Sequence, residues 1–428
     1  MPELQPFRGL RYVPRASADP SRLLCPPYDV VSDEQRAELA ALDEHNAIRL
    51  ELPHADVGAD PYAAAARSLA AWQADGTLMR DNTPLIYVYE QTFAVPGGAQ
   101  RVARSFFCRL RLEPYGPASG VRPHEHTMSG PKEDRLRLLS AVKANLSPVL
   151  MMYDDGAGGA TSRALLDELT AAPAALTASG PGGVGQRLWL ADPAGSESAA
   201  ELLRICGARP LTIADGHHRY ETALRYSTDS GAPPGAEFVM ALLYDSASGG
   251  LALLPWHRVI SAPLAGRAVI DAARTLFDVE PVASATDMIE RFEGTGSEAP
   301  AAGVIGVWTG DGGALLTVDR ARVAAHVDAN QAEAVRGLDV SVLSGTLSEM
   351  IGRSSEELVA QHEIAFVSDA RDAVARVDRG QASVCFLLAP TPVAAVLDVA
   401  AAGEHMPPKS TYFHPKAATG LVFNPLRP

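Results

Sequence analysis

The sequence contains no run of lysine and arginine, although 37 basic residues are spread over its 428 positions. The 51 acidic residues outnumber them and give a formal net charge of −14. Proteins that bind a duplex through its phosphates usually carry a basic face or a basic domain. We therefore expect no nucleic-acid partner, and small basic clusters in such an acidic chain are typical of sites for small anions.

Cysteine is also scarce, and the four residues, at 25, 108, 206 and 385, form no Cys-x-x-Cys pair. This spacing excludes a zinc framework and a disulfide scaffold, so we expect reduced, mostly buried thiols. The N-terminus lacks a basic segment followed by an apolar one, and the most apolar stretch, 383–402, is interrupted by two prolines and an aspartate. We therefore expect no signal peptide, no membrane span and a cytoplasmic protein.

What is present is an ordinary globular composition, with 47% hydrophobic and 21% charged residues. The length exceeds that of one common domain, and strand-like and helix-like runs alternate, which favours an α/β (α+β) fold with two domains. We place the first domain at 1–255, with a loop-bounded insertion at about 154–188 that its glycine-rich ends predict to be a flap or linker. A second α/β domain should span 256–400, followed by a proline-rich active-site loop and tail at 401–428.

Several local elements are predicted from shorter patterns. Ser32 followed by Gln35 is a capping box and predicts a helix that runs to about Leu42. The apolar run at 149–153 has the length and composition of a buried strand, and the short strand at 211–214 leads into a helix.

The sharpest motif is the segment 214–220, which reads Ala-Asp-Gly-His-His-Arg-Tyr and follows that strand. Gly216 leaves space where the backbone turns, and the helix that begins there attracts anions through its amides and dipole. His217, His218 and Arg219 surround the same point, and an arginine fork suits phosphate oxygens while imidazoles donate hydrogen bonds or move protons. The segment therefore predicts a phosphate-binding turn.

Asp215 could cap the helix, hold a Mg²⁺ ion or act as a base. The alternative interpretation of the motif is structural: Asp215 is a simple N-cap, the histidines are surface residues, and Arg219 pairs with Glu221 or another carboxylate. We favour the anion site because four functional side chains crowd one glycine turn.

A second motif contains Glu125 between His124 and His126. If the segment is extended, both histidines face one side and the glutamate the other, which permits two metal ligands or a carboxylate base. No third ligand is visible, so zinc is not expected. Lys132 and Arg135 begin a helix, where cations oppose the dipole unless an anion binds there. The alternative is a pair of loop histidines and a solvated charge cluster.

A third motif spans 405–416, where three prolines exclude a regular helix and stiffen the backbone. Such a loop can hold Lys409, Ser410, Thr411 and Lys416 against phosphate groups. The alternative interpretation is a tail strapped over the second domain.

Four segments together, 25–30, 123–135, 213–223 and 406–413, resemble one bacterial family. It is a domain-of-unknown-function family, number ten-fifteen, often labelled SpoOJ/ParA/ParB/RepB-like. The turn at 216–219 is also similar to the signature of the ParB/sulfiredoxin superfamily, whose members bind nucleotide phosphates at that turn. The free-serine kinases of this superfamily are similar there and transfer a nucleotide phosphate to the serine hydroxyl.

The resemblance implies a ParB/sulfiredoxin-like mixed α/β domain with a phosphate cradle at 216–219. Sulfiredoxin chemistry is excluded because a cysteine is needed in the turn, where this chain has His217. The acidic charge and the lack of a recognisable helix-turn-helix speak against DNA segregation.

We therefore expect a nucleotide-dependent phosphotransferase, a kinase that acts on a small hydroxyl metabolite, with free L-serine as the favoured acceptor. Its cofactors would be Mg²⁺, held by Asp215, and ATP or another nucleoside phosphate, without zinc, haem or flavin. Two alternatives are a ParB-like regulatory protein that binds nucleotide without turnover or DNA, and a phosphate-ester hydrolase. The oligomeric state stays open.

The expected site residues fall into three groups. The catalytic residues are Glu125, Asp215 and His217, with Asp29 as a further candidate for the base. The phosphate- and nucleotide-binding residues are Gly216, His217, His218, Arg219, Lys132, Arg135, Lys409, Ser410, Thr411 and Lys416. The substrate-binding residues are Tyr28, Asp29, His124, His126, Asn145 and Tyr412.

Overall fold

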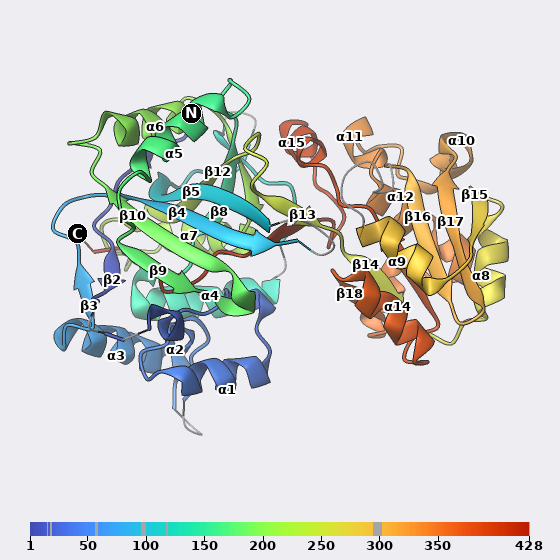
Figure 1. Cartoon of the computed structure of the whole chain (residues 1–428), viewed down its shortest axis with the longest axis horizontal. Coiled ribbons are helices and arrows are strands. Elements are labelled where there is room, and N and C mark those ends of the chain that lie inside the picture. Colours follow the sequence, from blue (N-terminus) through green and yellow to red (C-terminus); the bar gives the residue numbers. More distant parts are fainter. Residues whose placement is uncertain are drawn as a thin grey trace. The chain divides into compact units, whose positions relative to one another are not determined.

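The computed structural model describes residues 1–14, 16–17, 19–55, 59–95, 100–116, 119–127, 129–293 and 302–427. The chain divides into two compact units, each of mixed α/β structure, which confirms the fold class expected from the sequence (Figure 1). The first unit consists of Met1–Phe93, Gln100–Leu251 and Pro415–Pro428, and the second consists chiefly of Ala252–His414. The segment 401–428, which we set apart as an active-site loop and tail, is divided between the units, because its last fourteen residues belong to the first unit.

The first unit is built on a nine-stranded mixed sheet with the strand order β6-β11-β8-β12-β5-β4-β10-β9, and β1 pairs with β5. Strands β8 and β12 are buried along their whole length and pair in parallel, while β11 runs antiparallel to β8. The predicted strand at 149–153 is therefore a central strand. The strands are β1 Leu4–Gln5, β4 Ile86–Ala94, β5 Gln100–Arg111, β6 Val121–Arg122, β8 Val149–Tyr153, β9 Leu176–Ser179, β10 Gly185–Ala191, β11 Leu211–Asp215 and β12 Phe238–Asp245.

Helices α4 and α7 pack against each other, and α7 also contacts β8 and β12. Helix α1 begins as predicted, because the Ser32 hydroxyl accepts from the Gln35 amide and the Gln35 side chain accepts from the Ser32 amide. The helices of this unit are α1 Asp33–Leu42, α2 Ile48–Glu51, α3 Pro61–Ala74, α4 Ser129–Val142, α5 Ala160–Leu169, α6 Glu197–Gly207 and α7 His217–Ser227. Short 3-10 helices lie at Pro20–Leu23, Tyr28–Val30 and Pro181–Gly183.

The segment 154–188, expected to be a flap or linker, instead supplies β9 and the start of β10 to the sheet. The two strands pair antiparallel, and the glycine-rich run between them is the turn of this hairpin. Gly182 and Gly183 have φ values of 70° and 76° there, so the glycines serve a tight turn and not a flexible linker.

The C-terminal segment 415–427 is held along the first unit by backbone hydrogen bonds. It forms bridges from Thr419 to Cys25 and from Phe423 to Leu10. Its strand β21, Asn424–Pro425, pairs with β7, Ala144–Asn145, and a further two-stranded sheet joins β2, Leu10–Tyr12, to β3, Leu78–Arg80. These bonds fix the place at which Lys416 enters the unit.

The second unit contains a six-stranded antiparallel sheet with the order β15-β17-β16-β19-β14-β18. Helices α9 and α14 pack together against this sheet, and α8 packs with α12. The strands are β13 Ala252–Leu254, β14 His257–Ile260, β15 Phe277–Val282, β16 Val304–Thr309, β17 Gly312–Val318, β18 Ile364–Val367, β19 Val384–Leu388 and β20 Tyr412–His414. The helices are α8 Gly266–Ala273, α9 Ala285–Glu293, α10 Arg320–Val323, α11 Glu333–Arg336, α12 Asp339–Ile351, α13 Ser355–Ala360, α14 Ala370–Asp378 and α15 Val393–Ala401, with a 3-10 turn at Ala324–His326.

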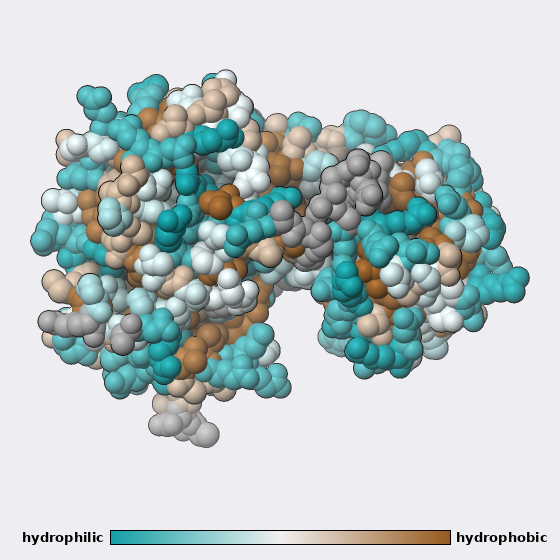
Figure 2. All heavy atoms as spheres, in the orientation of Figure 1, coloured by the Kyte–Doolittle hydropathy of each residue, from teal (hydrophilic) through white to brown (hydrophobic). Residues whose placement is uncertain are grey.

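Hydrophilic residues cover much of the visible face of each unit, with hydrophobic residues in smaller patches between them (Figure 2). All four cysteines are buried and unpaired, as their spacing predicted. Over the described ranges, no helix combines the length and the apolar character needed to cross a membrane.

Arg258 on β14 is a buried cation, with only 4% of its surface exposed. Its guanidinium donates to the carbonyl of Trp256 and lies 5.2 Å from the ring centroid of Phe366. Within the part of the chain that the structure describes, it forms no ion pair with a carboxylate, and burial lowers its pKa to about 9. A charge buried without a counter-charge opposes folding.

Replacing Arg258 by methionine should therefore stabilise the second unit by about 1–3 kcal/mol, because the apolar side chain fills similar space without the desolvation penalty. Differential scanning calorimetry would register a higher unfolding midpoint. Arg379→Met, at an exposed position of the same unit, is the control and should leave the midpoint nearly unchanged. A lower midpoint for Arg258→Met would mean that the guanidinium is a net structural support.

Candidate functional site

The turn between β11 and α7 has the geometry that the sequence predicts. Strand β11 ends at Asp215, Gly216 adopts a φ of 92°, and α7 begins at His217. A Cβ atom at Gly216 would lie 3.0 Å from Nε of Arg219, so both the backbone and the neighbouring guanidinium require glycine here. As the N-cap residue, Gly216 has no side chain that could accept from the first amides of the helix.

Asp215 lies between two cations. Its Oδ2 accepts from Nη2 of Arg219 at 2.7 Å, and its Oδ1 accepts from Nζ of Lys416. The Lys416 ammonium is also 3.6 Å from Oδ2 of Asp29. The side chains of Lys416 and Arg219 are only 11% and 12% exposed, so these charges interact in a largely desolvated environment.

The two cations determine the protonation of Asp215. Burial alone would raise the pKa of this carboxyl, but the charges of Lys416 and Arg219 hold it well below its usual range. Burial likewise opposes the charge on Lys416, and Asp215 and Asp29 outweigh it and raise the pKa of the ammonium. Asp215 is therefore a stable carboxylate and a weak proton acceptor. The alternative interpretation, in which Asp215 caps the helix, is wrong, because the N-cap residue is Gly216.

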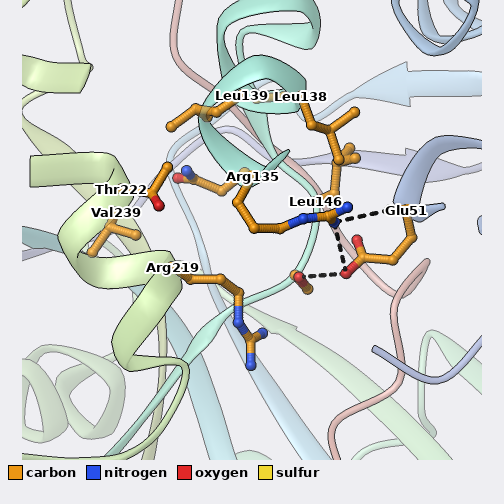
Figure 3. Close-up of a pocket in the computed structure, with 11 residues that line it drawn as sticks. Glu51, Arg135, Leu138, Leu139, Leu146, Arg219, Thr222 and Val239 are labelled. Carbon is orange, nitrogen blue, oxygen red and sulfur yellow. Dashed lines mark hydrogen bonds and ion pairs between the residues drawn. The ribbon is translucent and has the colours of Figure 1, made fainter. Parts of the chain in front are cut away.

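Arg219 is held on more than one side. Besides Asp215 it donates to the carbonyl of Pro148, and its Nε is buried with no acceptor among the described residues. The side chain lines a cavity of about 50 Å³ beside α4 and α7, which Arg135 and Glu51 also line (Figure 3). The guanidinium is thus fixed by neighbours at the end of β11 and in the loop before β8, and it does not pair with Glu221.

Arg135, expected to clamp phosphate, is engaged inside the unit. Its Nη1 donates to the carbonyl of Glu51 at 2.9 Å, its Nε donates to Asp134 at 2.8 Å, and the guanidinium lies 4.2 Å from the ring centroid of Tyr28. Burial is the main cause that raises the pKa of Tyr28 to about 12, so this phenol stays protonated at neutral pH. Arg135 therefore supports the turn that carries Tyr28 and leaves few donors for a ligand.

Asn145, expected to bind substrate, is also tied to the fold. Its Oδ1 accepts from the amide of Met240 at 2.9 Å and from the side chain of Asn424 at 2.8 Å. This arrangement joins β12 and the C-terminal segment. Its observed partners are structural.

The segment that contains Glu125 is anchored to the turn through its first histidine. The amide of His124 donates to Nε2 of His217 at 3.3 Å, and Nδ1 of His124 donates to the carbonyl of Ile213 at 2.7 Å. Nε2 of His217 is therefore an acceptor, which leaves it unable to donate to a phosphate. His124 is buried whereas His126 is exposed, so the two histidines do not share the environment expected for paired ligands.

A second polar group lies beside the first turns of α7. Nζ of Lys132 donates to Oγ1 of Thr127 at 2.9 Å and to Oε2 of Glu221 at 3.0 Å. Burial, reinforced by the charge of Lys132, lowers the pKa of His218. From the sequence we expected Glu221 only as a partner for Arg219, although its position three residues after His218 puts both on one face of the helix.

The other residues of the third motif belong to the second unit. Nζ of Lys409 lies 4.9 Å from the ring centroid of Trp256. The ring centroid of Tyr412 is also 4.9 Å from that of Trp256. Ser410 donates to the carbonyl of Pro407, and Thr411 accepts from the indole of Trp256. Of the cations predicted in this motif, Lys416 is the one that the structure brings to the turn within the first unit.

The residues around the turn do not fit the Mg²⁺ ligand expected at Asp215. Both of its oxygens already accept from cations, so a Mg²⁺ ion bound there would be placed beside two positive charges that repel it. Within the described ranges, no group of three histidine, cysteine, aspartate or glutamate side chains is arranged to hold a metal.

Solved structures that match this chain include a free serine kinase in complex with AMP, with 13% identity, 69% of this chain and 83% of that chain covered, and a TM-score of 0.36. SbnI with C-terminal truncation from Staphylococcus aureus matches with 11% identity, 72% and 84% coverage and a TM-score of 0.37. A conserved hypothetical protein from Pyrococcus furiosus matches with 12% identity, 69% and 87% coverage and a TM-score of 0.34. A comparison with curated proteins found no significant match.

One family model matches residues 4–341, which include most of the first unit and about half of the second. The matched range contains the Gly216 turn, the carboxylates of Asp29 and Asp215 and the Glu125 segment. Lys416 lies beyond the matched range. Because the match extends over well more than half of the sequence, the chain belongs to the family described as Protein of unknown function (DUF1015).

Proposed function

We propose that this protein is a nucleotide-dependent phosphotransferase that moves a phosphoryl group from ATP, or another nucleoside triphosphate, to the hydroxyl of a small metabolite. The observation that carries the proposal is the Gly216 turn, where the start of an eleven-residue helix meets the buried cations Arg219 and Lys416. The similarity of the turn sequence to that of free-serine kinases makes L-serine the first acceptor to test.

The turn has the properties that phosphate binding requires. The N-terminus of α7 carries partial positive charge and amide donors, and Gly216 allows an anion to approach the backbone closely. His218 and Lys132 stand beside the first turns of the same helix. Phosphoryl transfer depends mainly on positioning and on neutralising charge, and fixed cations in a desolvated site supply both.

Asp215 is proposed to position the cations. Its carboxylate holds Lys416 and Arg219 on one side of the turn, so their charges are already in place when the nucleotide arrives. Preorganised charges of this kind need little rearrangement during the reaction. The low pKa of Asp215 argues against its use as the base.

Glu125 is the proposed general base, with Asp29 as the second candidate. The segment of Glu125 is fixed to the turn through His124 and His217, and Asp29 is 3.6 Å from the Lys416 ammonium. In the proposed step the carboxylate takes the proton of the acceptor hydroxyl, and the oxygen attacks the terminal phosphorus. The bond from that phosphorus to the bridging oxygen breaks, and the nucleoside diphosphate leaves.

Replacing Glu125 by glutamine should lower kcat at least 100-fold and leave the nucleotide dissociation constant within about threefold of wild type, since a base typically contributes 10²–10⁴-fold. Isothermal titration calorimetry measures binding, and release of nucleoside diphosphate in the presence of serine or another acceptor measures turnover. Asp29→Asn is the matched variant for the second candidate. Full turnover by Glu125→Gln would remove Glu125 from the mechanism, and nucleotide binding without turnover by the wild type would favour a regulatory protein.

A further inference from the structure

A second basic site lies in the first unit, in a pocket of about 240 Å³. Four arginines from distant parts of the sequence line it: Arg8 after β1, Arg80 at the end of β3, Arg109 on β5 and Arg427 in the C-terminal segment. The C-terminal end of the chain lies near β3 (Figure 1), and Arg80 at the end of that strand donates to the carbonyl of Arg427. It shares no residue with the Gly216 turn.

The hydrogen bonds of these arginines go to neutral acceptors. Nε of Arg8 donates to the carbonyl of Asp81 at 2.8 Å, and Nη2 of Arg80 donates to the carbonyl of Arg427 at 2.9 Å. Nη2 of Arg109 donates to the side-chain amide oxygen of Gln5 at 2.6 Å. Within the part of the chain that the structure describes, none of the four forms an ion pair, although the protein has an excess of acidic residues.

The nearest carboxylates have other partners. The side chain of Asp81 is bound by Arg11 and accepts from the hydroxyl of Tyr87 at 2.8 Å. Glu237, the acidic residue that lines the pocket, accepts from the amide of Gly235 at 2.8 Å. Four positive charges therefore face one negative charge among the lining residues.

This arrangement is unfavourable without a ligand. Burial lowers the pKa of Arg80, and repulsion by Arg8 lowers it further. Burial also lowers the pKa of Arg109, whose Nε is buried without an acceptor among the described residues. Like charges gathered in one partly desolvated pocket repel one another, and a bound anion would relieve both the repulsion and the unmet donor.

We propose that this pocket binds a small phosphate-bearing anion, either a phosphorylated metabolite or inorganic pyrophosphate. Guanidinium groups recognise phosphate oxygens in pairs of parallel hydrogen bonds, and four arginines line a volume here that fits a diphosphate-sized group. The site is independent of the Gly216 turn and of the proposed phosphotransfer. Because Arg427 forms one wall, the ligand would also hold the C-terminal segment against β3.

The experiment adds inorganic pyrophosphate, as the probe, to the full-length protein. Hydrogen exchange read by mass spectrometry would locate the binding, because the amides of Phe423 and Leu426 are hydrogen-bonded to neighbouring segments and their exchange reports how firmly the C-terminal segment is held. Pyrophosphate should slow exchange in peptides covering 5–12 and 421–427. The double variant Arg8→Gln/Arg427→Gln removes the guanidinium groups of two exposed residues, and at least tenfold more pyrophosphate should then be needed for the same protection.

Arg204→Gln is the matched control, since this arginine is exposed and paired with Glu201 on a helix remote in sequence from the pocket. In this variant, pyrophosphate should slow hydrogen exchange as much as it does in the wild type. Unchanged protection in the double variant would overturn the proposal. Protection limited to peptides around 211–220 would overturn it too, and that result would at the same time support phosphate binding at the Gly216 turn.

Discussion

Lys416→Met is expected to lower the free energy of unfolding of the first unit by about 3–5 kcal/mol, the usual consequence of removing one partner from a buried ion pair. Asp215 would keep Arg219 as its only cation while remaining largely buried. Urea unfolding followed by circular dichroism measures the change. Lys132→Met removes a more exposed lysine, 32% accessible and paired with Glu221, and should cost less than about 1 kcal/mol.

The loss caused by Lys416→Met should depend on pH. In the wild type the folded-state pKa of Asp215 lies below its unfolded value, so its ionisation stabilises the fold above about pH 4, and this contribution is lost as the pH falls through the folded pKa. Without Lys416, burial would raise the pKa of Asp215 relative to the wild type. The difference between the two proteins should be largest near pH 7 and shrink as the pH falls below about 4, and a difference that does not change with pH would contradict the assigned charge pairing.

A double-mutant cycle separates the ion pair from simple loss of packing. Lys416→Met leaves the buried Asp215 carboxylate with one cation fewer, and Asp215→Asn removes that negative charge. The double variant should therefore be more stable than the sum of the two single losses predicts. A coupling energy near zero would show that Lys416 stabilises the unit through its aliphatic stem.

Gly216→Ala is expected to weaken nucleotide binding at least 100-fold. A left-handed backbone costs a residue with a Cβ about 1–2 kcal/mol, and here the new atom would also press on the Arg219 guanidinium at 3.0 Å. Either the turn rotates and the start of α7 moves, or Arg219 leaves its place, and each change disrupts the proposed phosphate site. Calorimetric titration with ATP measures the loss.

Gly352→Ala is the matched control for this backbone effect. Gly352 has a φ of 74° at the end of α12, and a Cβ there would meet no atom within 4 Å. The backbone cost of alanine there should be similar to that in Gly216→Ala, and the Gly352→Ala variant should bind ATP like the wild type. Wild-type affinity in Gly216→Ala would mean that nucleotide phosphates bind elsewhere.

The fold was predictable where local patterns determine it. The capping box at Ser32, the apolar strand at 149–153 and the strand, glycine and helix around 216 are encoded by neighbouring residues. The hairpin of β9 and β10 was missed because its glycine-rich turn has the composition of a linker, and only pairing with β4 reveals its place in the sheet.

The candidate site was predictable as a set of residue types but not as a set of contacts. The bond between Asp215 and Lys416 joins residues 201 positions apart, and no sequence spacing indicates it. Arg135 was expected to face a ligand, yet its donors are used by Glu51 and Asp134. The arginine pocket could not be predicted at all, because its four residues come from four segments that only folding brings together.

The most direct test of the proposed phosphotransfer is to incubate the purified protein with a pool of small metabolites and ATP labelled at its terminal phosphate, and to search for new phosphorylated species by mass spectrometry. We expect a labelled phosphate ester of a small hydroxyl compound, with serine examined first, and no such product from Glu125→Gln. A wild-type protein that binds the nucleotide but forms no labelled product from any amino acid or polyol would contradict it.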